Sequence, residues 1–524
     1  MKKSSLILSA AIAAIMSAQV VSADPLNIGV VNNTGVPFTY QADGSKIDPA
    51  GHVHCTKGLC NSTTPNGAQM WFGWTGAWGN HDWVALNYAN KEQEIGFNLS
   101  VNTVYPDTTY MQVSLSPWEG NFLKCYLNDH VPPNVKVKVA SGSKITITCP
   151  PNPGPFANTP ASAPATENGK PVIFHTHNDS MLDQDNKPVL LRGVVRASLE
   201  WAKYGQNLSD QDIANMHTLW SANTIRIDLN QDYWLSSAPE TTPGSYKQIV
   251  DAMIYEATKN NMAVILDLHW VNGKQDILGD EKSLDFWKSV ATKYKNYGTV
   301  MFELYNEPFQ GGKMTNDFWM NGGKPSTSGD TYVGYQQLYN AVRSTGAQNI
   351  VIVNGKNYGF DLSWVNANTG IGIIKDAEGN PGKNIVYGAH PYQSKFTGYP
   401  NIEYSDFKTQ FDKNFEGIKG QYPIIFTEFG DNDPNDYPTG YNTIYKDVLQ
   451  YADENQINYT AFNWFVASQY TPVSMPTLIS DWDKPTCVNG GCLIQPDMTK
   501  IHPGTSFSFD QSLSGKVLTS PNHS

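Results

Sequence analysis

The chain has 524 residues, which is long for one domain and indicates two. A hydrophobic content of 40% is enough for a large core, and a net charge of −12 argues against nucleic acid and anionic membranes as partners. The low charged content of 16% and the high aromatic content of 12% suit neutral ligands such as sugars, whose apolar faces stack on aromatic rings.

The first residues have the layout of a bacterial secretory signal peptide. Lys2 and Lys3 precede an apolar run over residues 6–16, and Val21-Ser22-Ala23 then supplies small residues for cleavage. A membrane anchor is the alternative, but this run is too short for one, and no later segment holds 18 uninterrupted apolar residues. We therefore predict that residues 1–23 are a signal peptide and that the mature protein is secreted.

Residues 24–150 show the period-two alternation that is typical of β-strands. Apolar residues alternate with polar ones in three runs, which contain Met111, Val113 and Leu115, then Val135, Val137 and Val139, then Ile145 and Ile147. Gly, Asn and Pro punctuate these runs, and no long amphipathic helix is apparent. We expect a small antiparallel sandwich or barrel-like domain here.

The cysteines can pair in 15 ways, but their spacing favours short local loops. Cys55–Cys60 and Cys487–Cys492 each span five residues, which would leave Cys125 to pair with Cys149. Export makes disulfides the default. His52 and His54, beside Cys55, could imitate a metal site, but we favour a disulfide-bonded surface loop.

Four tryptophans crowd one segment of this domain, namely Trp71, Trp74, Trp78 and Trp83. If the rings are exposed, they could form a sugar-stacking platform and make the domain a carbohydrate-binding module. If they are buried, they are simply the core of a small sandwich. The sequence leaves both interpretations open.

Residues 151–168 are rich in Pro, Ala, Thr and Asn, a composition that cannot form a packed core. We predict a semi-extended linker there, followed by a second domain over residues 169–510 and a tail over residues 511–524. Two histidines of the second domain, His175 and His177, lie before its first strand and are expected in a surface hairpin.

The second domain alternates strands with helices. Helix signals include Ser209 and Asp212, which resemble a capping box, and the run from Phe286 to Tyr294, which has apolar residues at three- and four-residue spacing. Eight strands are predicted, over residues 189–195, 224–229, 263–268, 300–305, 350–353, 385–389, 424–427 and 459–463. Continuously apolar strands require a parallel sheet covered on both faces. Eight such units predict an α/β fold of the (β/α)8 TIM barrel type, with an open doubly wound sheet as the alternative.

Polar residues follow six of the predicted strands, at the ends where TIM barrels carry their chemistry. Any one of them could have a structural role, but six on one face are hard to explain as packing. The segments are Arg226 to Asp228, Asp267 to Trp270, Tyr305 to Pro308, Ala389 to Tyr392, Thr427 to Gly430 and Phe462 to Trp464.

Two of these segments offer a glutamate directly after an apolar run, Glu307 and Glu428. Glycoside cleavage needs one protonated carboxyl for the leaving oxygen and one ionised carboxyl to attack the anomeric carbon. A separation of roughly 5 Å gives retention of the anomeric configuration, while a wider gap leaves room for water and gives inversion. Strands four and seven lie across a barrel mouth, which is compatible with the short distance.

The tripeptide Asn306-Glu307-Pro308 after an apolar strand, with Glu428 on strand seven, resembles glycoside hydrolase family 5, the cellulase and mannanase family. The resemblance extends over about residues 170–470. It includes Arg226, His269, His390-x-Tyr392 and Trp464, each after the corresponding strand.

The resemblance implies a role for each matching position. Glu307 would be the acid/base, with a raised pKa, and Glu428 the nucleophile. Arg226 and Tyr392 would hydrogen-bond Glu428 and keep it ionised. The remaining positions would contact the sugar: Asn306 its 2-hydroxyl, His269 and His390 the subsite around the cleaved bond, and Trp464 the floor under the ring.

Other residues keep two interpretations. Asp267 and Trp270 are expected in packing or supporting roles, and Glu200-Trp201 either lines the cleft or is structural. Residues 471–524 either wall the substrate groove or simply close the domain. Phe465 leaves the shape of the neighbouring subsite open, because the family often has a smaller or polar residue there.

We therefore expect a secreted, monomeric, retaining endo-β-glycosidase that cuts a β-1,4-glucan, with β-mannan or another β-glycan as the alternative substrate. Its partner would be a polysaccharide, without cofactor or metal, and neither nucleic acid nor membrane is expected. Two rival classes remain. One is a non-catalytic carbohydrate-binding protein, and the other is a metal-dependent hydrolase that uses His269, His390 and a carboxylate.

Overall fold

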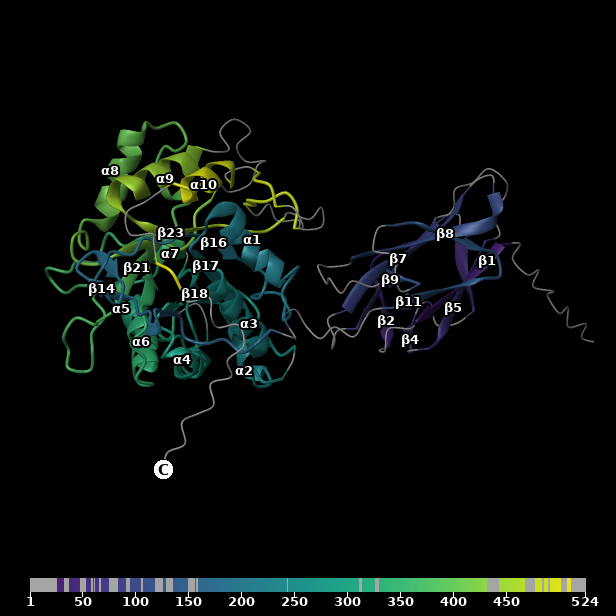
Figure 1. The fold of residues 1–524 in the computed structure, drawn as a ribbon, viewed down its shortest axis with the longest axis horizontal. Helices are drawn as coiled ribbons and strands as arrows, with labels where there is room; N and C mark the ends of the chain where they lie inside the picture. Colours follow the sequence, from purple (N-terminus) through teal and green to yellow (C-terminus); the bar gives the residue numbers. More distant parts are fainter. Residues whose placement is uncertain are drawn as a thin grey trace, which may run out of the picture. The chain divides into compact units, whose positions relative to one another are not determined.

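The computed structural model divides the chain into two compact units, Met1–Pro151 and Asn152–Ser524 (Figure 1). It describes residues 26–32, 37–47, 53–57, 60, 62–65, 67–74, 83–90, 95–104, 107–117, 126–128, 135–148, 156, 159–242, 244–310, 313–325, 329–430, 443–466, 476–482, 485–488, 491–500 and 507–509. The predicted signal peptide and the predicted C-terminal tail lie outside these ranges.

The N-terminal unit is a β-sandwich-like domain, as the alternation of its sequence predicted. One sheet has the strand order β3-β5-β1-β11-β9 and the other has the order β10-β8-β7-β6-β2-β4. The strands are β1 (Leu26–Asn32), β2 (Phe38–Ile47), β3 (Val53–Lys57), β4 (Thr63–Thr64), β5 (Gln69–Trp74), β6 (Trp83–Asn90), β7 (Ile95–Val104), β8 (Asp107–Pro117), β9 (Tyr126–Leu127), β10 (Val137–Ala140) and β11 (Lys144–Thr148). All pairings are antiparallel except that of β1 with β11.

Period-two alternation fills the core of this unit from both sheets. Met111, Val113 and Leu115 of β8 are buried, and so are Ile145 and Ile147 of β11. In the third predicted run, burial deepens along the chain: Val135 is exposed before β10 begins, Val137 is partly buried and Val139 is buried.

The tryptophans of this unit differ in burial. Trp74 belongs to the core, whereas Trp71 and Trp83 are partly exposed. Trp71 faces outward over Gly29, and the Lys144 ammonium lies 5.8 Å from its ring centroid. Trp78 lies outside the described residues, and carbohydrate binding by this unit stays a prediction.

Two of the predicted disulfides are present, Cys55–Cys60 and Cys487–Cys492. Cys125 and Cys149, the third predicted pair, lie outside the described residues, as does His52. His54 lies on β3 and is partly buried.

The second unit contains a closed barrel of eight parallel strands, as predicted (Figure 1). Its strands are β16 (Arg192–Arg196), β17 (Thr224–Asn230), β18 (Ala263–Trp270), β19 (Val300–Glu303), β20 (Val351–Asn354), β21 (Ile385–Ala389), β22 (Ile424–Phe426) and β23 (Asn458–Ala461). The first strand pairs with the last in parallel, which closes the sheet. All eight predicted strands are confirmed, although their ends shift by up to three residues.

Helices cover the outside of the barrel. They are α1 (Asp210–Trp220), α2 (Gln231–Ser236), α3 (Tyr246–Lys259), α4 (Glu281–Tyr294), α5 (Asn316–Asn321), α6 (Tyr335–Arg343), α8 (Tyr404–Phe415), α9 (Thr443–Asn455) and α10 (Gly491–Met498). The short α7 (Lys356–Gly359), which contains non-helical residues, follows β20, and the 3-10 turn η1 (Gln393–Lys395) follows β21. The Ser209 side chain caps α1 by accepting from the Asp212 backbone N–H. The predicted apolar face of α4, from Phe286 to Tyr294, is buried. In the described residues, no helix is long and apolar enough to cross a membrane.

Two short hairpins precede the barrel. They are formed by β12 (Thr166–Glu167) with β13 (Lys170–Pro171), and by β14 (His175–His177) with β15 (Ser180–Leu182), which is the predicted histidine hairpin. Part of the predicted linker is anchored to the barrel unit, because Ser162 donates to both carboxylate oxygens of Asp251 on α3. Specific hydrogen bonds thus tie part of the second half of the predicted linker to the barrel unit, and the linker bounds stay a prediction.

The described residues after β23 close the barrel unit. Leu478 and Ile479 are buried in the main core, and α10 packs against α9 and α1. This arrangement favours the closing-segment interpretation of the C-terminal region. Residues 467–475 lie outside the described part of the chain.

Candidate active site

Side chains that point into the barrel change from apolar to polar along four of its strands, β18, β19, β20 and β22. Alternate residues of a strand face the same side, so successive inward-facing residues are two positions apart. In each of these strands an apolar inward-facing residue is followed, two positions later, by a polar one. The apolar members form a separate small core at one end of the barrel, and the polar members follow them toward the carboxyl ends. The pairs are Ile265 and Asp267, Met301 and Glu303, Ile352 and Asn354, and Ile425 and Thr427.

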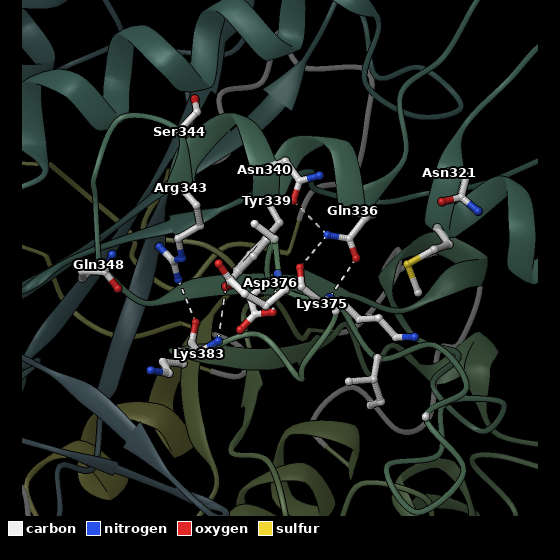
Figure 2. Close-up of a pocket in the computed structure, with 16 residues that line it drawn as sticks. Asn321, Gln336, Tyr339, Asn340, Arg343, Ser344, Gln348, Lys375, Asp376 and Lys383 are labelled. Carbon is white, nitrogen blue, oxygen red and sulfur yellow. Dashed lines mark hydrogen bonds between the residues drawn. The ribbon is translucent and has the colours of Figure 1, made fainter.

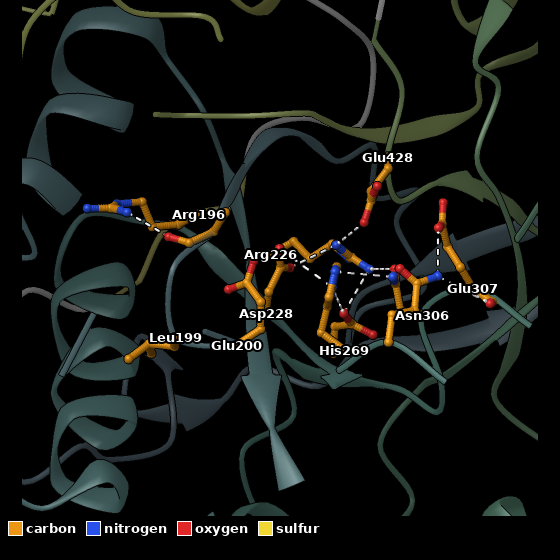
Figure 3. A network of polar contacts seen from close by, with 12 residues as sticks. Arg196, Leu199, Glu200, Arg226, Asp228, His269, Asn306, Glu307 and Glu428 are labelled. Atoms are coloured by element: carbon orange, nitrogen blue, oxygen red, sulfur yellow. Dashed lines mark hydrogen bonds and ion pairs between the residues drawn. The ribbon is translucent and has the colours of Figure 1, made fainter. Parts of the chain in front are cut away.

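Arg226 on β17 is the centre of the polar layer (Figure 3). Its Nε donates to Glu303 Oε2 at 2.6 Å, its Nη1 to Glu428 Oε1 at 2.7 Å and its Nη2 to Asn306 Oδ1 at 2.8 Å. The guanidinium is fully buried. Burial opposes its charge, but the surrounding carboxylates, with Asp267 and Glu303 foremost, raise the pKa of Arg226 well above its usual range.

Glu428, two residues after the end of β22, is held at both oxygens. Arg226 binds Oε1, and the Tyr392 hydroxyl donates to Oε2 at 2.9 Å. These are the two contacts that the family resemblance implied. They present the carboxylate to the barrel mouth in one orientation, with a fixed positive charge on one side.

Glu307, which follows β19, has different partners. His390 Nδ1 lies 2.9 Å from Oε1, and the Gln275 amide donates to Oε2 at 2.8 Å. One oxygen of Glu307, one oxygen of Glu428 and a ring nitrogen of His390 all lie within 4.8 Å of one another. The two carboxyl groups therefore face each other across a short gap.

The surroundings of Glu307 do not give it the raised pKa that was predicted. Burial raises the pKa, but hydrogen bonds from His390 and Gln275 outweigh it and lower the pKa. Burial opposes the charge of His390 as well, yet Glu428, Glu303 and Glu307 raise the pKa of His390 to about 10. At neutral pH the proton of the Glu307–His390 pair therefore resides on the imidazole.

His390 links the two glutamates to the deeper network. As an imidazolium it donates from Nδ1 to Glu307 and from Nε2 to Thr427 Oγ1 at 2.9 Å, and Thr427 donates to Glu303 Oε1 at 2.8 Å. Asn354 donates to the same Glu303 oxygen at 2.6 Å. Each polar atom in this chain has one defined role as donor or acceptor, which fixes the orientation of the ring.

His269 is positioned by a separate pair of contacts. Its Nδ1 lies 2.7 Å from Asp267 Oδ2, and its Nε2 lies 3.2 Å from the Asn306 amide nitrogen. A neutral ring that donates from Nδ1 and accepts at Nε2 satisfies both. Asp267 also pairs with Arg226 at 2.9 Å, so it has the supporting role that was one of its two interpretations.

Glu200, after β16, is buried beside Asp228 and His269, with one atom of each residue within 4.8 Å of the others. Burial and the charge of Asp228 raise the pKa of Glu200 to about 8. Burial likewise raises the pKa of Asp228 to about 7, although Arg226 opposes this. Trp201, which follows Glu200 in the chain, is partly exposed and packs edge-on against the buried Phe465.

The prediction that Trp464 forms the sugar floor is wrong. Trp464 is fully buried, packs edge-on against Trp220 of α1 at 5.0 Å, and donates from Nε1 to Asp212 Oδ1 at 2.9 Å. It lies beyond the end of β23, which stops at Ala461 rather than at the predicted Asn463. Its side chain therefore packs with the helices outside the barrel.

The partly exposed aromatic residue at this strand end is Phe462. It has the same parity as Thr460, whose hydroxyl donates to the Thr427 backbone carbonyl inside the barrel. Phe462 also pairs with the segment after Glu428, since its N–H donates to the Phe429 carbonyl. It therefore lies in the position that had been assigned to the tryptophan.

The sequence interpretation missed three residues of this network, namely Glu303, Asn354 and Gln275. Glu303 and Asn354 could have been found, because each is a polar residue at the end of an otherwise apolar buried strand. Gln275 lies in the loop after β18, and no local pattern marks it.

Among the residues that the structure describes, two groups of side chains could hold a metal ion, Glu200 with Asp228 and His269, and Glu307 with His390 and Glu428. The metal-dependent alternative needs both histidines in one site, but they fall in different groups. In each histidine both ring nitrogens already have protein partners. The donor sets therefore fit a hydrogen-bonded network better than a shared metal site.

A hollow of about 960 Å³ lies apart from these residues, between α5, α6 and residues 370–383 (Figure 2). Its polar groups largely bond to one another: Gln336 bonds to Lys375, and Arg343 donates to the Lys383 carbonyl. It contains none of the predicted site residues.

A TIM barrel that brings two glutamates together at the carboxyl ends of its strands defines the glycoside hydrolase type of site. The family model Cellulase (glycosyl hydrolase family 5) matches residues 182–468, more than half of the chain, and the chain belongs to this family. It is a glycoside hydrolase.

Proteins that are similar to this chain in sequence are named cellulase or endoglucanase. Cellulase CelDZ1 of Thermoanaerobacterium sp is 24% identical over 321 residues, which cover 60% of this chain and 75% of that protein. An endoglucanase of Clostridium saccharobutylicum is 27% identical over 258 residues, which cover 48% of each chain. A β-glucanase of Saccharophagus degradans, crystallised with cellotetraose, has 20% identity and a TM-score of 0.47, and the match covers 65% of this chain and 97% of that one.

Proposed function

We propose that this protein is a retaining endo-β-glycosidase that hydrolyses β-1,4-glucan, with Glu307 as acid/base and Glu428 as nucleophile. The observation that carries the proposal is the short gap between the two carboxyl groups, whose nearest oxygens are within 4.8 Å. Retaining enzymes have carboxyl groups about 5–5.5 Å apart, and inverting enzymes separate them by about 6.5–9.5 Å to admit a water molecule.

In the first step, Glu428 attacks the anomeric carbon while the bond from that carbon to the leaving oxygen breaks. Arg226 and Tyr392 hold the Glu428 oxygens for this attack. The leaving oxygen takes a proton from Glu307, and the sugar stays bound to Glu428 as an ester. In the second step, water attacks the same carbon, Glu307 takes the proton from the water, and Glu428 is released as a carboxylate.

His390 supplies the proton that Glu307 needs. Glu428 makes the largest contribution that raises the pKa of His390, and Glu428 loses its charge as the ester forms. The imidazolium then becomes a stronger acid, and its proton moves from Nδ1 to Glu307 Oε1 over a hydrogen bond of 2.9 Å. When the second step restores the charge of Glu428, the proton from water returns by the same route.

The proposed substrate is a neutral β-1,4-glucan, which is supported by the cellulase and endoglucanase names of the similar proteins. Phe462 offers a partly exposed ring at the barrel mouth beside the segment of Glu428, and we propose it as the floor under the sugar ring. Asn306 and His269, which hold each other in place, would meet the sugar hydroxyls.

A panel of soluble polysaccharides, with the anomer of the first product followed by NMR, tests the proposal. We expect carboxymethylcellulose to be cleaved faster than galactomannan or xyloglucan, with the β-anomer formed first. Release of the α-anomer first would exclude retention. Faster cleavage of galactomannan would replace glucan by mannan as the substrate, which is the alternative that the sequence left open.

We also propose that the enzyme acts outside the cell after removal of residues 1–23, because polymeric glucan is too large to enter a cell. Mass spectrometry of the protein from culture medium tests this: a mature chain that begins near Asp24 is expected. Recovery of only the full-length chain inside cells would contradict it.

A further inference from the structure

A sharp turn reverses the chain directly after β18. Val271 and Lys274 exchange backbone hydrogen bonds of 2.9 and 3.2 Å, and Asn272 and Gly273 between them have φ values of 52° and 71°. Asn followed by Gly is the pair that best tolerates positive φ at both central positions of a two-residue turn. The residue that leaves this turn is Gln275, so its place in the chain is set by a defined backbone geometry.

The same loop is then fixed to the chain on both sides of Glu307. The Asp276 N–H donates to the Tyr305 hydroxyl at 3.1 Å, and this hydroxyl donates to the Asp276 carbonyl at 2.7 Å. The Phe309 N–H donates to the Ile277 carbonyl at 3.1 Å. Tyr305 precedes Glu307 by two residues and Phe309 follows it by two, so these hydrogen bonds hold the loop and the glutamate in one register.

From this position Gln275 binds the Glu307 carboxyl group. Its Nε2 donates to Oε2 at 2.8 Å and to the Glu307 backbone carbonyl at 3.4 Å. Both acceptors are oxygens, so the amide must turn its NH2 group toward them. The other carboxyl oxygen, Oε1, lies 2.9 Å from His390 Nδ1. Glu307 therefore has an amide at one oxygen, which keeps its hydrogens, and an imidazole at the other, which can release one.

These two partners determine which oxygen of Glu307 can carry a proton. A hydrogen on Oε2 would meet the N–H of Gln275, and two donors that face each other leave one without an acceptor. A hydrogen on Oε1 meets Nδ1 of His390, which accepts once its own proton has left. The amide thus leaves Oε1 as the oxygen that exchanges a proton, and a proton held at one place is what general acid catalysis requires.

Other titratable and charged groups face Glu307 from other elements. His390 follows β21, His269 lies on β18, and Glu428 follows β22 and approaches within 4.8 Å. The ammonium group of Lys395 in η1 is attracted by the charge of Glu307. All of these groups remain when the amide of the β18 loop is replaced, so the replacement changes one hydrogen bond of the carboxyl group and leaves its other partners in place.

We propose that Gln275 is a positioning residue for the catalytic acid, and that its amide directs the transferable proton to Oε1 of Glu307. In the first step the Nδ1–H bond of His390 breaks as an Oε1–H bond forms, and the leaving oxygen then takes this hydrogen as its bond to the anomeric carbon breaks. In the second step the proton of the attacking water returns through Oε1 to Nδ1. This proposal rests on the proposed function, because it takes Glu307 as the acid.

Two substrates with different leaving groups test this role through kcat/KM, which reports the first step. Cellopentaose needs a proton at its leaving oxygen, whereas β-cellobiosyl fluoride releases fluoride and needs none. Gln275→Met removes the donor and keeps a side chain of similar length. We expect its kcat/KM on cellopentaose to fall about tenfold at both pH 5 and pH 8, a part of the roughly 10²–10⁴-fold that general acid catalysis supplies. On the fluoride the change should stay within about twofold.

Gln275→Glu makes the donor depend on pH, which a merely structural role would not. At pH 5 the new carboxyl group carries a proton that it can donate to Oε2, because two carboxyl groups in contact cannot both ionise easily. At pH 8 it is ionised and repels Glu307. Relative to wild type, kcat/KM on cellopentaose should be within about threefold at pH 5 and about tenfold lower at pH 8. On the fluoride this ratio should vary less than about twofold.

Gln450→Glu is the matched control. Gln450 on α9 is exposed, and its amide donates to Glu454 Oε1 at 3.0 Å, so it repeats the pairing of an amide with a carboxylate on the outside of the barrel. Its kcat/KM should equal that of the wild type on both substrates at both pH values. Retained activity of the Gln275 variants on the fluoride shows that they are folded.

The outcomes distinguish the two proposals. Full activity of Gln275→Met on cellopentaose, equal losses on both substrates, or a loss in Gln275→Glu that is the same at pH 5 and pH 8 would overturn the positioning role while leaving the catalytic assignment in place. A wild-type protein that cleaves neither substrate would overturn the proposed function and the positioning role together.

Discussion

The two glutamates of the barrel mouth stand in contrasting surroundings. Glu428 is bound by Arg226 and Tyr392, and its side chain is 5% exposed. Glu307 is bound by His390 and Gln275, and its side chain is 15% exposed. An arginine does not release its proton in a protein, whereas an imidazole does so within the working range of pH. The proposed nucleophile thus has a fixed charge beside it, and the proposed acid has a movable proton.

The strongest test of this contrast removes each carboxylate in turn. Glu428→Gln and Glu307→Gln should each lower kcat on polysaccharide by at least ~10²–10³-fold, the scale of lost nucleophilic or acid/base catalysis. The two should differ on β-cellobiosyl fluoride, whose leaving group needs no proton: formation of the ester should survive in Glu307→Gln and be lost in Glu428→Gln. A near-normal rate on polysaccharide in either variant would contradict the catalytic role proposed for that glutamate. Circular dichroism would show whether each variant is folded.

The next test removes the fixed charge. In Arg226→Met the buried Asp228, Glu303 and Glu428 lose their common cation, and we expect the barrel to lose about 3 kcal/mol of stability in urea unfolding. Arg343→Met is the matched control, since Arg343 donates to backbone carbonyls rather than to carboxylates. A loss in Arg226→Met no larger than in the control would show that the carboxylates do not depend on Arg226.

The third test removes the movable proton. In the wild type the His390–Glu307 pair keeps its proton up to the pKa of His390, about 10. In His390→Gln, Glu307 alone must hold it, so the alkaline limb of the kcat/KM profile should move to lower pH. Activity at pH 9 relative to pH 5 should fall about tenfold or more against the wild-type ratio. An unmoved alkaline limb would contradict the relay.

The smallest expected effect concerns Glu200, which the mechanism does not use. Burial and Asp228 raise its pKa to about 8, above the value near 4.5 of an unfolded chain. Between pH 4.5 and pH 8 the folded protein keeps a proton on Glu200, whereas the unfolded chain has lost it. The free energy of unfolding therefore decreases as pH rises through this range. Glu200→Gln should therefore be more stable than wild type at pH 8.5, by at least about 1 kcal/mol, and little changed at pH 4.5. Glu378→Gln, at an exposed carboxylate, should show no such pH dependence.

Local patterns in the sequence predicted the fold because they follow directly from geometry. A strand covered on both faces must be apolar throughout, and eight apolar runs separated by amphipathic segments are enough to define the barrel. The same logic located Glu307 and Glu428, since the carboxyl ends of barrel strands meet at one mouth. Arg226 and Tyr392 followed from the family resemblance, and the structure brings both to Glu428.

The error at Trp464 shows where local patterns fail. The family resemblance implied that Trp464 lies at the barrel mouth, and the last strand was predicted to end two residues later than it does. Its Nε1 instead meets Asp212 in the first helix, 252 residues away in the chain. Phe462 is partly exposed and faces the same side of the strand as Thr460, which is the inside of the barrel. No residue propensity distinguishes inward-facing from outward-facing positions of a strand.

The sequence by itself determined the strands, the barrel and the pair of glutamates, because these depend on periodicity and on which residues end a strand. Only the tertiary structure decided which group holds the proton, since the pKa of Glu307 depends on His390 and Gln275. It also decided that Gln275 lies beside Glu307, because hydrogen bonds to Tyr305 and Phe309 hold its loop there. These couplings arise between residues that are distant in the chain, and only folding brings those residues together.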